Sequence, residues 1–349
     1  MKAGVLVQNG VIVYQDVVNP DIGSDMVLVK VKASGICGSD IPRVFAGKAS
    51  KYPLILGHEF SGEVSAIGSH VKNVRMNDKV VAAPLLPCMQ CEACLKGDYA
   101  LCSNYSFIGS RIDGAFAEYI AVPERNIVRL ADNADFVHSV FFEPSTVALH
   151  ALLHTHFGKG ASLAVLGCGT IGIFVIQWAK ILGAGMIAAF DISSDKLRLA
   201  SAFGADYTIN PISEDPAAIS GKLTDKRGFD FVIEAAGSTQ TMRLSFLLAG
   251  NKATICYIGT PKTELTFSPE LFENMNRKEF TLTGSWMSYS KPFPGQEWEM
   301  TRDHLGKGDL KISEAFIHKR YPLSRISEAF SEFLEPNKVQ GKIILINDR

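Results

Sequence analysis

A glycine-rich turn between a short apolar run and a helical pattern constrains the fold of this chain more than any other feature. Its residues are Gly167-Cys168-Gly169-Thr170-Ile171-Gly172, a G-x-G-x-x-G spacing, preceded by the apolar run 162–166. In this context the first glycine permits a tight turn, the second lets a pyrophosphate approach the backbone, and the third lets the helix pack close to the sheet. The free N–H groups at the helix start, at Thr170 and Ile171, favour phosphate binding. We therefore expect a dinucleotide site.

An acidic residue, Asp191, ends the next apolar run, at the distance of about 20 residues that this kind of site requires. Its carboxylate can accept hydrogen bonds from both hydroxyls of an adenosine ribose and would repel a 2′-phosphate. The following residues, Ile192-Ser193-Ser194, include no Arg that would offset this repulsion. The sequence therefore predicts NAD rather than NADP. The alternative is a glycine turn and a helix-capping Asp that bind no ligand.

The order of apolar runs predicts an α/β fold with two domains. From about Gly158, short strands alternate with helices, which is typical of a parallel sheet covered on both faces. The expected strands are 162–166, 186–190, 231–233, 253–258 and 280–283, and the expected helices are 170–182 and 195–203. The earlier part of the chain is rich in Val, Gly and turn signals and is expected to be β-rich, with strands at 27–33 and 78–83. The alternation stops after Ser285, and we hypothesise that the tail, with a strand at 342–346, returns to the first domain.

The composition argues against several classes of protein. Of the 349 residues, 47% are hydrophobic and 20% are charged, and the formal net charge is −1. No Lys/Arg run is longer than a pair, which disfavours nucleic acid or an anionic membrane as a partner. No apolar stretch approaches the roughly 18–20 residues needed to span a bilayer, and the first residues reach a polar side chain too soon for a signal peptide. We therefore expect a cytoplasmic protein.

Four of the seven cysteines are crowded into one short segment. Cys88, Cys91, Cys94 and Cys102 have the spacing C-x₂-C-x₂-C-x₇-C, which suits a tetrahedral structural zinc held by four thiolates. An iron–sulfur cluster can use similar spacing, but the proline-flanked ferredoxin pattern is missing. Four free thiols in a loop would oxidise. A closed site of this kind would fold the segment and take no part in the chemistry.

A second set of metal-ligating residue types is spread over three distant segments. Cys37 lies in Gly35-Ile36-Cys37-Gly38-Ser39-Asp40, His58 in Gly57-His58-Glu59, and Glu143 in Phe142-Glu143-Pro144. A thiolate, an imidazole and a carboxylate can hold zinc and leave a position open for water or substrate. Each residue alone is more often structural, so the prediction depends on their occurrence together with a nucleotide site.

Taken in order along the chain, these motifs resemble those of the zinc-containing medium-chain dehydrogenase/reductase family. The resemblance covers essentially the whole chain. It implies a GroES-like catalytic domain, formed by residues 1–150 with 286–349 and including a structural zinc lobe at 85–105, and a Rossmann NAD-binding domain at 151–285. It also implies two zinc ions per chain.

The resemblance assigns roles to the residues of the dispersed set. Cys37 and His58 match catalytic zinc ligands of the family. Glu143, in Glu-Pro, resembles the third ligand of the sorbitol-dehydrogenase branch, where alcohol dehydrogenases proper use cysteine. Glu59 is expected just behind the metal, able to enter its shell in some states.

The proton relay departs from the liver-type enzymes of the family. Ser39 resembles the hydroxyl that passes on the substrate proton, and Asp40 resembles the carboxylate that orients the histidine ligand. Liver-type enzymes complete the relay with a histidine five residues after the first ligand, where this chain has Pro42. The proton must therefore leave by another path.

Several stretches narrow the resemblance to the branch that oxidises galactitol 1-phosphate: 85–88, 107–111, 284–290 and 294–299. This implies oxidation of a secondary alcohol of a polyol phosphate to a ketone, with hydride transfer to NAD. Arg43, Arg111 and Lys291 are the candidates for binding the phosphate.

Other functions remain open at this point. Within the family they are a dehydrogenase of an unphosphorylated polyol such as sorbitol, of 2,3-butanediol or of threonine. Outside it they are a non-catalytic nucleotide-binding protein on the same scaffold, or a zinc-free quinone reductase, which would lack the cysteine lobe. The family resemblance also implies a homo-oligomer, with a dimer that pairs strand 280–283 favoured over a tetramer.

Overall fold

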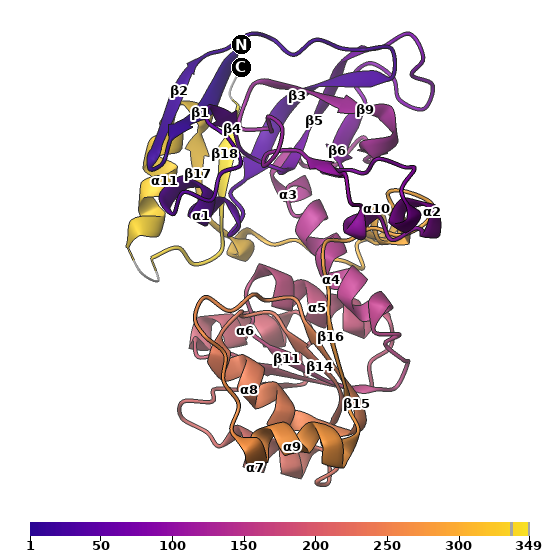
Figure 1. Cartoon of the computed structure of the whole chain (residues 1–349), viewed down its shortest axis with the longest axis vertical. Helices are drawn as coiled ribbons and strands as arrows, with labels where there is room; N and C mark the ends of the chain where they lie inside the picture. Colours follow the sequence, from indigo (N-terminus) through magenta and orange to yellow (C-terminus); the bar gives the residue numbers. More distant parts are fainter. Residues whose placement is uncertain (336–337, 348–349) are drawn as a thin grey trace. The chain divides into compact units, whose positions relative to one another are not determined.

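The structure, a computed structural model, describes residues 1–335 and 338–347. It divides into two compact units (Figure 1). Unit 1 comprises Met1–Glu143, Tyr289–Gly308 and Ile312–Arg349, and unit 2 comprises Pro144–Ser288 and Asp309–Lys311. The change from one unit to the other thus lies between Glu143 and Pro144, whereas the sequence-based boundary was placed after residue 150.

Unit 1 is built on a mostly antiparallel sheet that the C-terminal segment completes, with β17 and β18 as its parallel pair. Its seven strands are arranged in the order β10-β6-β5-β3-β18-β17, with β9 also paired to β3. Strand β18 pairs with β3 so that Ile344 lies opposite Gly35. The bounds are β3 Met26–Gly35, β5 Glu59–Ile67, β6 Lys79–Ala82, β9 Tyr119–Pro123, β10 Ile127–Arg129, β17 Ile317–Pro322 and β18 Lys342–Ile346.

Smaller elements of unit 1 surround this sheet. A second sheet has the strand order β2-β1-β4, and β7 pairs with β8 beside the cysteine segment. The bounds are β1 Lys2–Gln8, β2 Val11–Asp16, β4 Leu54–Ile55, β7 Leu85–Leu86, β8 Ser106–Phe107, α1 Asp40–Phe45, α2 Glu92–Lys96, α3 Phe136–Ser139, α10 Gln296–Lys307 and α11 Ile326–Ser331.

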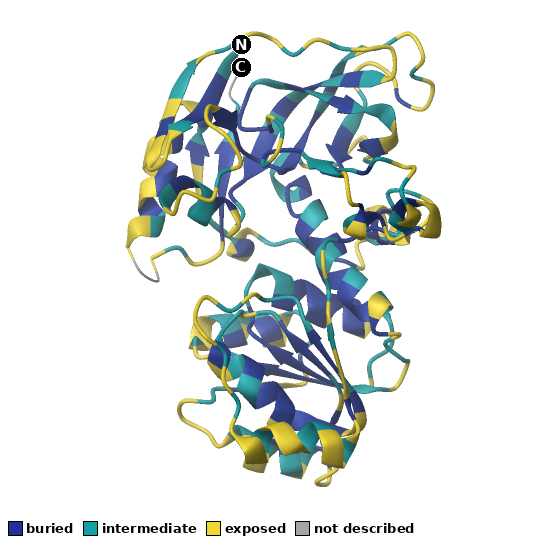
Figure 2. Cartoon of the chain, viewed as in Figure 1, coloured by how far each residue is buried: buried dark blue, intermediate teal, exposed yellow. Residues whose placement is uncertain are grey.

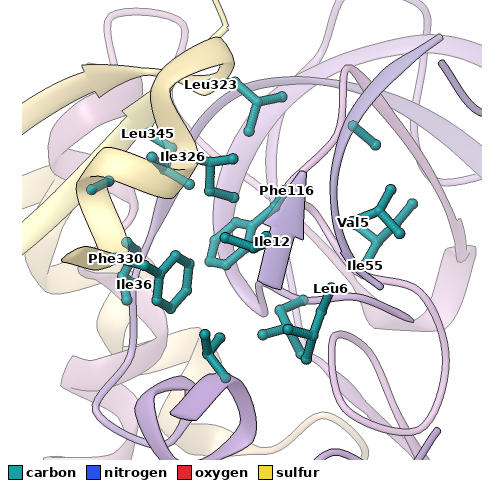
Figure 3. Packing of buried hydrophobic residues seen from close by; sticks show 14 of the residues in the cluster. Val5, Leu6, Ile12, Ile36, Ile55, Phe116, Leu323, Ile326, Phe330 and Leu345 are labelled. Carbon is teal, nitrogen blue, oxygen red and sulfur yellow. The ribbon is translucent and has the colours of Figure 1, made fainter. Parts of the chain in front are cut away.

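The two ends of the sequence share one hydrophobic core in unit 1 (Figure 3). Ile326 and Phe330 of α11 pack with Leu6 and Phe116, all four less than 2% exposed. The contact between the first strand and α11 is close, because a Cβ added at Gly4 would lie 2.4 Å from Ile326 Cδ1. Burial of such side chains contributes about 1.5–3 kcal/mol each, which holds the tail on the N-terminal strands.

Unit 2 is a six-stranded parallel sheet in the order β13-β12-β11-β14-β15-β16. Its inner strands are buried and the outward sides of its helices are exposed (Figure 2). The order reverses between β11 and β14, and ligands bind outside the carboxyl ends of the strands at such a switch point. The bounds are β11 Ser162–Leu166, β12 Met186–Phe190, β13 Tyr207–Ile209, β14 Phe229–Glu234, β15 Ala249–Tyr257, β16 Thr281–Gly284, α4 Phe142–His154, α5 Thr170–Ile181, α6 Ser194–Ala202, α7 Pro216–Leu223, α8 Thr239–Leu248 and α9 Pro269–Lys278; α4 begins in unit 1.

The predicted strands and helices of the alternating region are confirmed, with ends that differ by a few residues. The short β13 was not predicted because its three residues, with two of them exposed, make no apolar run. One stretch contradicts the expectation that nothing is long and apolar enough for a membrane span. Phe136–His154, which covers α3 and α4, meets that test by length and composition; 61% of the tested window is buried inside the structure, as in the core helix of a soluble protein.

A buried carboxylate, Glu332, links the C-terminal segment to β17. It accepts hydrogen bonds from the Tyr321 hydroxyl and from Lys319 Nζ at 3.2 Å, and Lys338 Nζ lies 3.0 Å from its second oxygen. The Tyr321 hydrogen bond, followed by Lys338 and Lys319, lowers the pKa of Glu332 from 4.5 to about 2.

Glu332 should therefore make stability depend on acid pH. Its folded-state pKa is depressed, so its stabilising contribution is present above pH 4.5 and is lost as the pH falls towards 2. We expect Glu332→Gln to be less stable than the wild type at pH 7 and the difference to shrink between pH 4.5 and 2. Urea unfolding across this pH range measures it. A difference that stays constant with pH would contradict the assignment.

Candidate metal and cofactor sites

The register of β3 and β5 brings the first two dispersed motifs together. Gly35, the last residue of β3, pairs with Glu59, the first residue of β5. Cys37 follows β3 by two residues and His58 directly precedes β5, so both lie at the same end of the strand pair. The ligand atoms of Cys37, His58 and Glu59 all lie within 4.8 Å of one another. We call these three residues the Cys37 group.

A buried lysine that sequence reasoning missed faces this group. Lys342 Nζ, at the start of β18, donates a hydrogen bond to Glu59 Oε2, and the two side chains are 7% and 3% exposed. Gly35 leaves room for the pair, because a Cβ there would lie 2.6 Å from Glu59 Oε2 and 2.8 Å from Lys342 Cδ. Burial lowers the pKa of Lys342, but the nearby Glu59, Cys37 and Glu143 outweigh it and raise the pKa above its usual value.

Glu143 lies in the first turn of α4 and is partly buried. Burial, opposed by His58 and aided by Glu59, raises the pKa of Glu143 to about 7. These effects indicate that Glu143 is near His58 and Glu59. However, the group of ligand atoms that lie within 4.8 Å of one another consists of Cys37, His58 and Glu59, so its carboxylate comes from Glu59. The assignment of Glu143 as third ligand therefore stays a prediction, and Glu59 is a competing one.

The Cys37 group has the chemistry of a divalent-cation site. Burial and the neighbouring Glu59 raise the pKa of the Cys37 thiol. A bound cation would reverse this effect, since a coordinating thiol is deprotonated. Within the described chain, the buried His58 Nδ1 has no hydrogen-bond partner, and Asp40 Oδ1 is 3.8 Å away. A thiol, an imidazole and a carboxyl group fit zinc.

A hydrogen-bond network extends from Cys37 through Ser39 to Arg43. Ser39 Oγ donates to Cys37 Sγ at 3.3 Å and accepts from Arg43 Nη1 at 2.8 Å. The same Arg43 nitrogen lies 3.1 Å from Oδ1 of the fully buried Asp40, whose Oδ2 accepts from Cys37 N at 3.0 Å. Arg43, which directly follows Pro42, thus donates to the hydroxyl that was predicted to pass on the substrate proton.

The other two candidate phosphate ligands make contacts elsewhere. Arg111 stacks on the Tyr105 ring, 3.7 Å from its centroid, and donates to Tyr105 O at 2.5 Å. Lys291 Nζ donates to Leu95 O at 3.4 Å. Among the three, Arg43 is the residue whose described contacts lead to Cys37.

The four-cysteine segment brings its sulfurs together as a metal site requires. The ligand atoms of Cys88, Cys91, Cys94 and Cys102 lie within 4.8 Å of one another, and the Sγ atoms of Cys88 and Cys94 are 4.0 Å apart. Zinc–sulfur bonds of about 2.3 Å imply about 3.8 Å between sulfurs in a tetrahedron. Backbone N–H groups of Cys94 and Ser103 lower the pKa of Cys91 to about 6, which favours a thiolate.

The glycine motif of unit 2 has the geometry of a nucleotide site. Gly167 turns the chain after β11 with a φ of 95°, and a Cβ at Gly172 would lie 1.9 Å from Gly167 O. A Cβ at Gly169 would meet nothing within 4 Å, so the protein's own packing does not require glycine there. A pyrophosphate that approaches the backbone at this position would require glycine there. Asp191, directly after β12, accepts from Cys168 N at 2.8 Å and Ser193 N at 2.9 Å.

Comparisons with known proteins agree with this architecture. The alcohol dehydrogenase GroES-like domain matches residues 23–132, and the zinc-binding dehydrogenase domain matches residues 170–302. The fold and its sites thus define a zinc-binding dehydrogenase with a GroES-like domain and a Rossmann-like parallel sheet.

Full-length relatives make the assignment more specific. Galactitol 1-phosphate 5-dehydrogenase of Escherichia coli (strain K12) is 40% identical over 99% of this chain and 100% of its own length. The crystal structure of galactitol-1-phosphate dehydrogenase from Escherichia coli superposes with a TM-score of 0.94, covering 99% of this chain and 100% of that chain. This chain therefore belongs to the zinc-containing medium-chain dehydrogenase/reductase family, whose members are oxidoreductases.

Two further relatives have different ligands or substrates in their names. L-threonine 3-dehydrogenase of Symbiobacterium thermophilum is 34% identical, over 96% of this chain and 94% of that protein. A zinc-binding dehydrogenase of Sinorhizobium meliloti 1021, solved bound to NADP, is 31% identical with a TM-score of 0.90 and covers 99% of this chain and 98% of that chain. The family by itself therefore leaves the substrate and the choice between NAD and NADP open.

Proposed function

We propose that this chain oxidises a secondary alcohol of a polyol phosphate of the galactitol 1-phosphate kind to the ketone, with transfer of the hydride to NAD. The observation that carries the proposal is the Cys37 group, three ligand atoms within 4.8 Å beside the Ser39–Arg43 network. The 40% identity to galactitol 1-phosphate 5-dehydrogenase supports the substrate class.

The residues of unit 1 have separate roles in this reaction. Cys37 and His58, with Glu143 or Glu59 as the carboxylate, would hold zinc, and this ion would supply the Lewis acid that lowers the pKa of an alcohol as it does that of water, to about 7. Ser39 Oγ accepts the alcohol proton as it passes its own onward. Arg43 holds this hydroxyl in place but stays protonated, so the proton continues to water. Asp40 keeps Arg43 and the Cys37 backbone in position.

Arg43 is the residue that we expect to recognise the phosphate. Its remaining N–H groups can grip a phosphate while Nη1 holds Ser39. Arg43→Lys keeps the positive charge but loses the paired N–H groups of the guanidinium. It should lower kcat/KM for galactitol 1-phosphate by about 10- to 100-fold, since charge-assisted hydrogen bonds contribute about 1.5–3 kcal/mol. Initial rates with galactitol 1-phosphate and galactitol measure the selectivity, with Arg111→Lys as matched control. An equal loss on both substrates would show that Arg43 positions Ser39 and does not read phosphate.

Asp191 supports NAD as the cofactor. Its carboxylate is held at the end of β12 by two backbone N–H groups and carries the negative charge that a 2′-phosphate would meet. Asp191→Gly should lower kcat/KM for NAD by about tenfold or more and raise the value for NADP, because one hydrogen-bonded charge is removed. Steady-state kinetics with both cofactors measure this. A wild type that prefers NADP would contradict the proposal.

A substrate panel tests the proposed function itself. NAD reduction should be measured side by side with galactitol 1-phosphate, sorbitol, 2,3-butanediol and L-threonine. We expect the phosphate ester to have the highest kcat/KM. Rapid turnover of another compound without turnover of the ester would reject the substrate class and leave the family assignment intact.

We further propose two zinc ions per chain, a homodimer and a cytoplasmic location. The cysteine segment and the Cys37 group supply the two sets of ligands. Strand β16 is the edge of the unit 2 sheet and most of its residues are exposed, which supports pairing with a second copy. Zinc analysis by mass spectrometry and light scattering of the purified protein measure the metal content and the oligomer.

A further inference from the structure

Five aromatic rings form a continuous column inside unit 1. The ring centroids are 5.3 Å apart for Tyr99 and Phe293, 5.7 Å for Phe293 and Tyr289, 6.1 Å for Tyr289 and Trp298, and 5.6 Å for Trp298 and Phe142. The last three pairs are stacked, and the first meets edge to face. We call these five residues the aromatic column. It unites three segments that are far apart in sequence.

One end of the column belongs to the four-cysteine segment. Tyr99 lies between Cys94 and Cys102, is 5% exposed, and accepts a hydrogen bond at its backbone oxygen from Cys102 N at 3.1 Å. The middle of the column is tied to the same segment, because the Tyr289 hydroxyl accepts a buried hydrogen bond from Leu85 N at 3.1 Å. The placement of these rings therefore depends on how the segment is folded.

The other end of the column adjoins Glu143, the predicted carboxylate ligand of the catalytic metal. Phe142 is fully buried against Trp298, which is also fully buried, and it directly precedes Glu143 in the first turn of α4. The field of Glu143 acts on the Tyr289 hydroxyl as well: burial and the Glu143 charge both raise the pKa of Tyr289. Glu143 is thus joined to the column through its chain neighbour Phe142.

We propose that the aromatic column couples the two metal sites, so that metal bound by the four cysteines strengthens metal binding by the Cys37 group through the position of Glu143. This inference rests on the version of the proposed function in which the zinc held at the Cys37 group also takes Glu143 as a ligand. A four-thiolate site folds its segment when metal binds. Close-packed buried rings transmit a displacement because the interior has no free volume to absorb it. The coupling is necessarily reciprocal for the two binding free energies.

The test measures the effect of one substitution in the cysteine segment, Cys91→Ser, in a chain with the intact aromatic column and in a chain whose column is interrupted. The probe is Co²⁺ alone, in competition with a chelator. The measured quantity is the dissociation constant of Co²⁺ at the Cys37 group. This site is identified as the one whose Co²⁺ binding is lost in Cys37→Ser. In the otherwise wild-type chain, Cys91→Ser should weaken this binding by about tenfold, a typical coupling between sites. In a Trp298→Leu background, Cys91→Ser should change it less than about twofold, because independent sites are additive.

Two further variants separate coupling from general damage. Trp298→Phe keeps a ring in the column and should retain about the tenfold effect of Cys91→Ser. Phe330→Leu removes a buried ring from the core in Figure 3, outside the column, and should also retain it. Where Trp298→Leu does not unfold cooperatively, Phe293→Leu replaces it, since Phe293 is only partly buried.

Equal weakening by Cys91→Ser in the wild-type and Trp298→Leu backgrounds would overturn the proposal, as would no weakening in the wild-type background. Hydrogen exchange adds a readout that is independent of turnover. Filling the Cys37 group should slow exchange in residues 85–105 of the wild type and not of Trp298→Leu. If Cys37→Ser leaves Co²⁺ binding unchanged, the proposed function fails, and that result is distinct from a failure of the column.

Discussion

Replacing Cys37 with serine should remove one metal ion per chain and lower kcat/KM by at least about a thousandfold. The thiolate is the anionic ligand that all versions of the site share, and the acidity of the bound alcohol depends on the metal. Losing three orders of magnitude corresponds to about 4 kcal/mol of transition-state stabilisation, which is the scale expected when a central electrostatic group is removed. Metal analysis and steady-state rates on the same preparation measure both effects.

A matched cysteine provides the control for this prediction. Cys256 is fully buried in β15 of unit 2, outside both cysteine-containing groups. Cys256→Ala should keep the wild-type metal content and turnover within about twofold, apart from the modest stability cost of a small cavity. A Cys37→Ser protein that retains its full metal content would place the ion elsewhere and reject the Cys37 group as the site.

Replacing Lys342 with methionine should cost about 3–5 kcal/mol of unfolding free energy in the metal-free protein, because removing one partner of a buried pair leaves an uncompensated charge. Lys342 is 7% exposed and Glu59 is 3% exposed, so water cannot take over the interaction. Methionine keeps the length of the side chain, which limits the packing loss. Urea unfolding in the presence of a chelator measures the change.

Two companion variants test the electrostatic cause. Lys180→Met removes one side of an exposed pair, in which the side chains are 56% and 36% accessible, and should cost less than about 1 kcal/mol. In the single variant Lys342→Met, the buried Glu59 carboxylate has lost its partner. The double variant Lys342→Met/Glu59→Gln also removes this charge and should recover part of the lost stability. A double variant no more stable than Lys342→Met would attribute the effect to packing rather than to the ion pair.

Local spacing was sufficient to predict much of the fold and part of the candidate sites. The alternation of apolar runs predicted the strands β11, β12, β14, β15 and β16 and the helices α5 and α6, because each repeats within a short window. The four cysteines and the glycine motif are likewise local, and their residues lie as their spacing indicated. By contrast, the segment 136–154 was not singled out, because polar residues such as Ser139, Glu143 and Thr146 interrupt its apolar residues.

Contacts between distant segments set the limit of this reasoning. Glu59 was expected just behind the metal and able to enter its shell in some states, and the fold places its carboxylate within 4.8 Å of the ligand atoms of Cys37 and His58. Arg43 was a candidate phosphate ligand, and its hydrogen bond to Ser39 depends on the turn into α1. No sequence pattern around Lys342 predicts its buried pair with Glu59, because this pair arises from the pairing of β18 with β3.

The sequence by itself determined which chemistry this chain can perform: the thiols, imidazole, carboxyl groups and glycines have residue types and spacings that specify metal and nucleotide binding. Only the tertiary structure decided which of these groups meet and what surrounds them, including the Lys342–Glu59 pair and the aromatic column. The physical reason is that the register of β3, β5 and β18 and the packing of buried rings depend on the whole chain, whereas ligand type and turn geometry are properties of a few neighbouring residues.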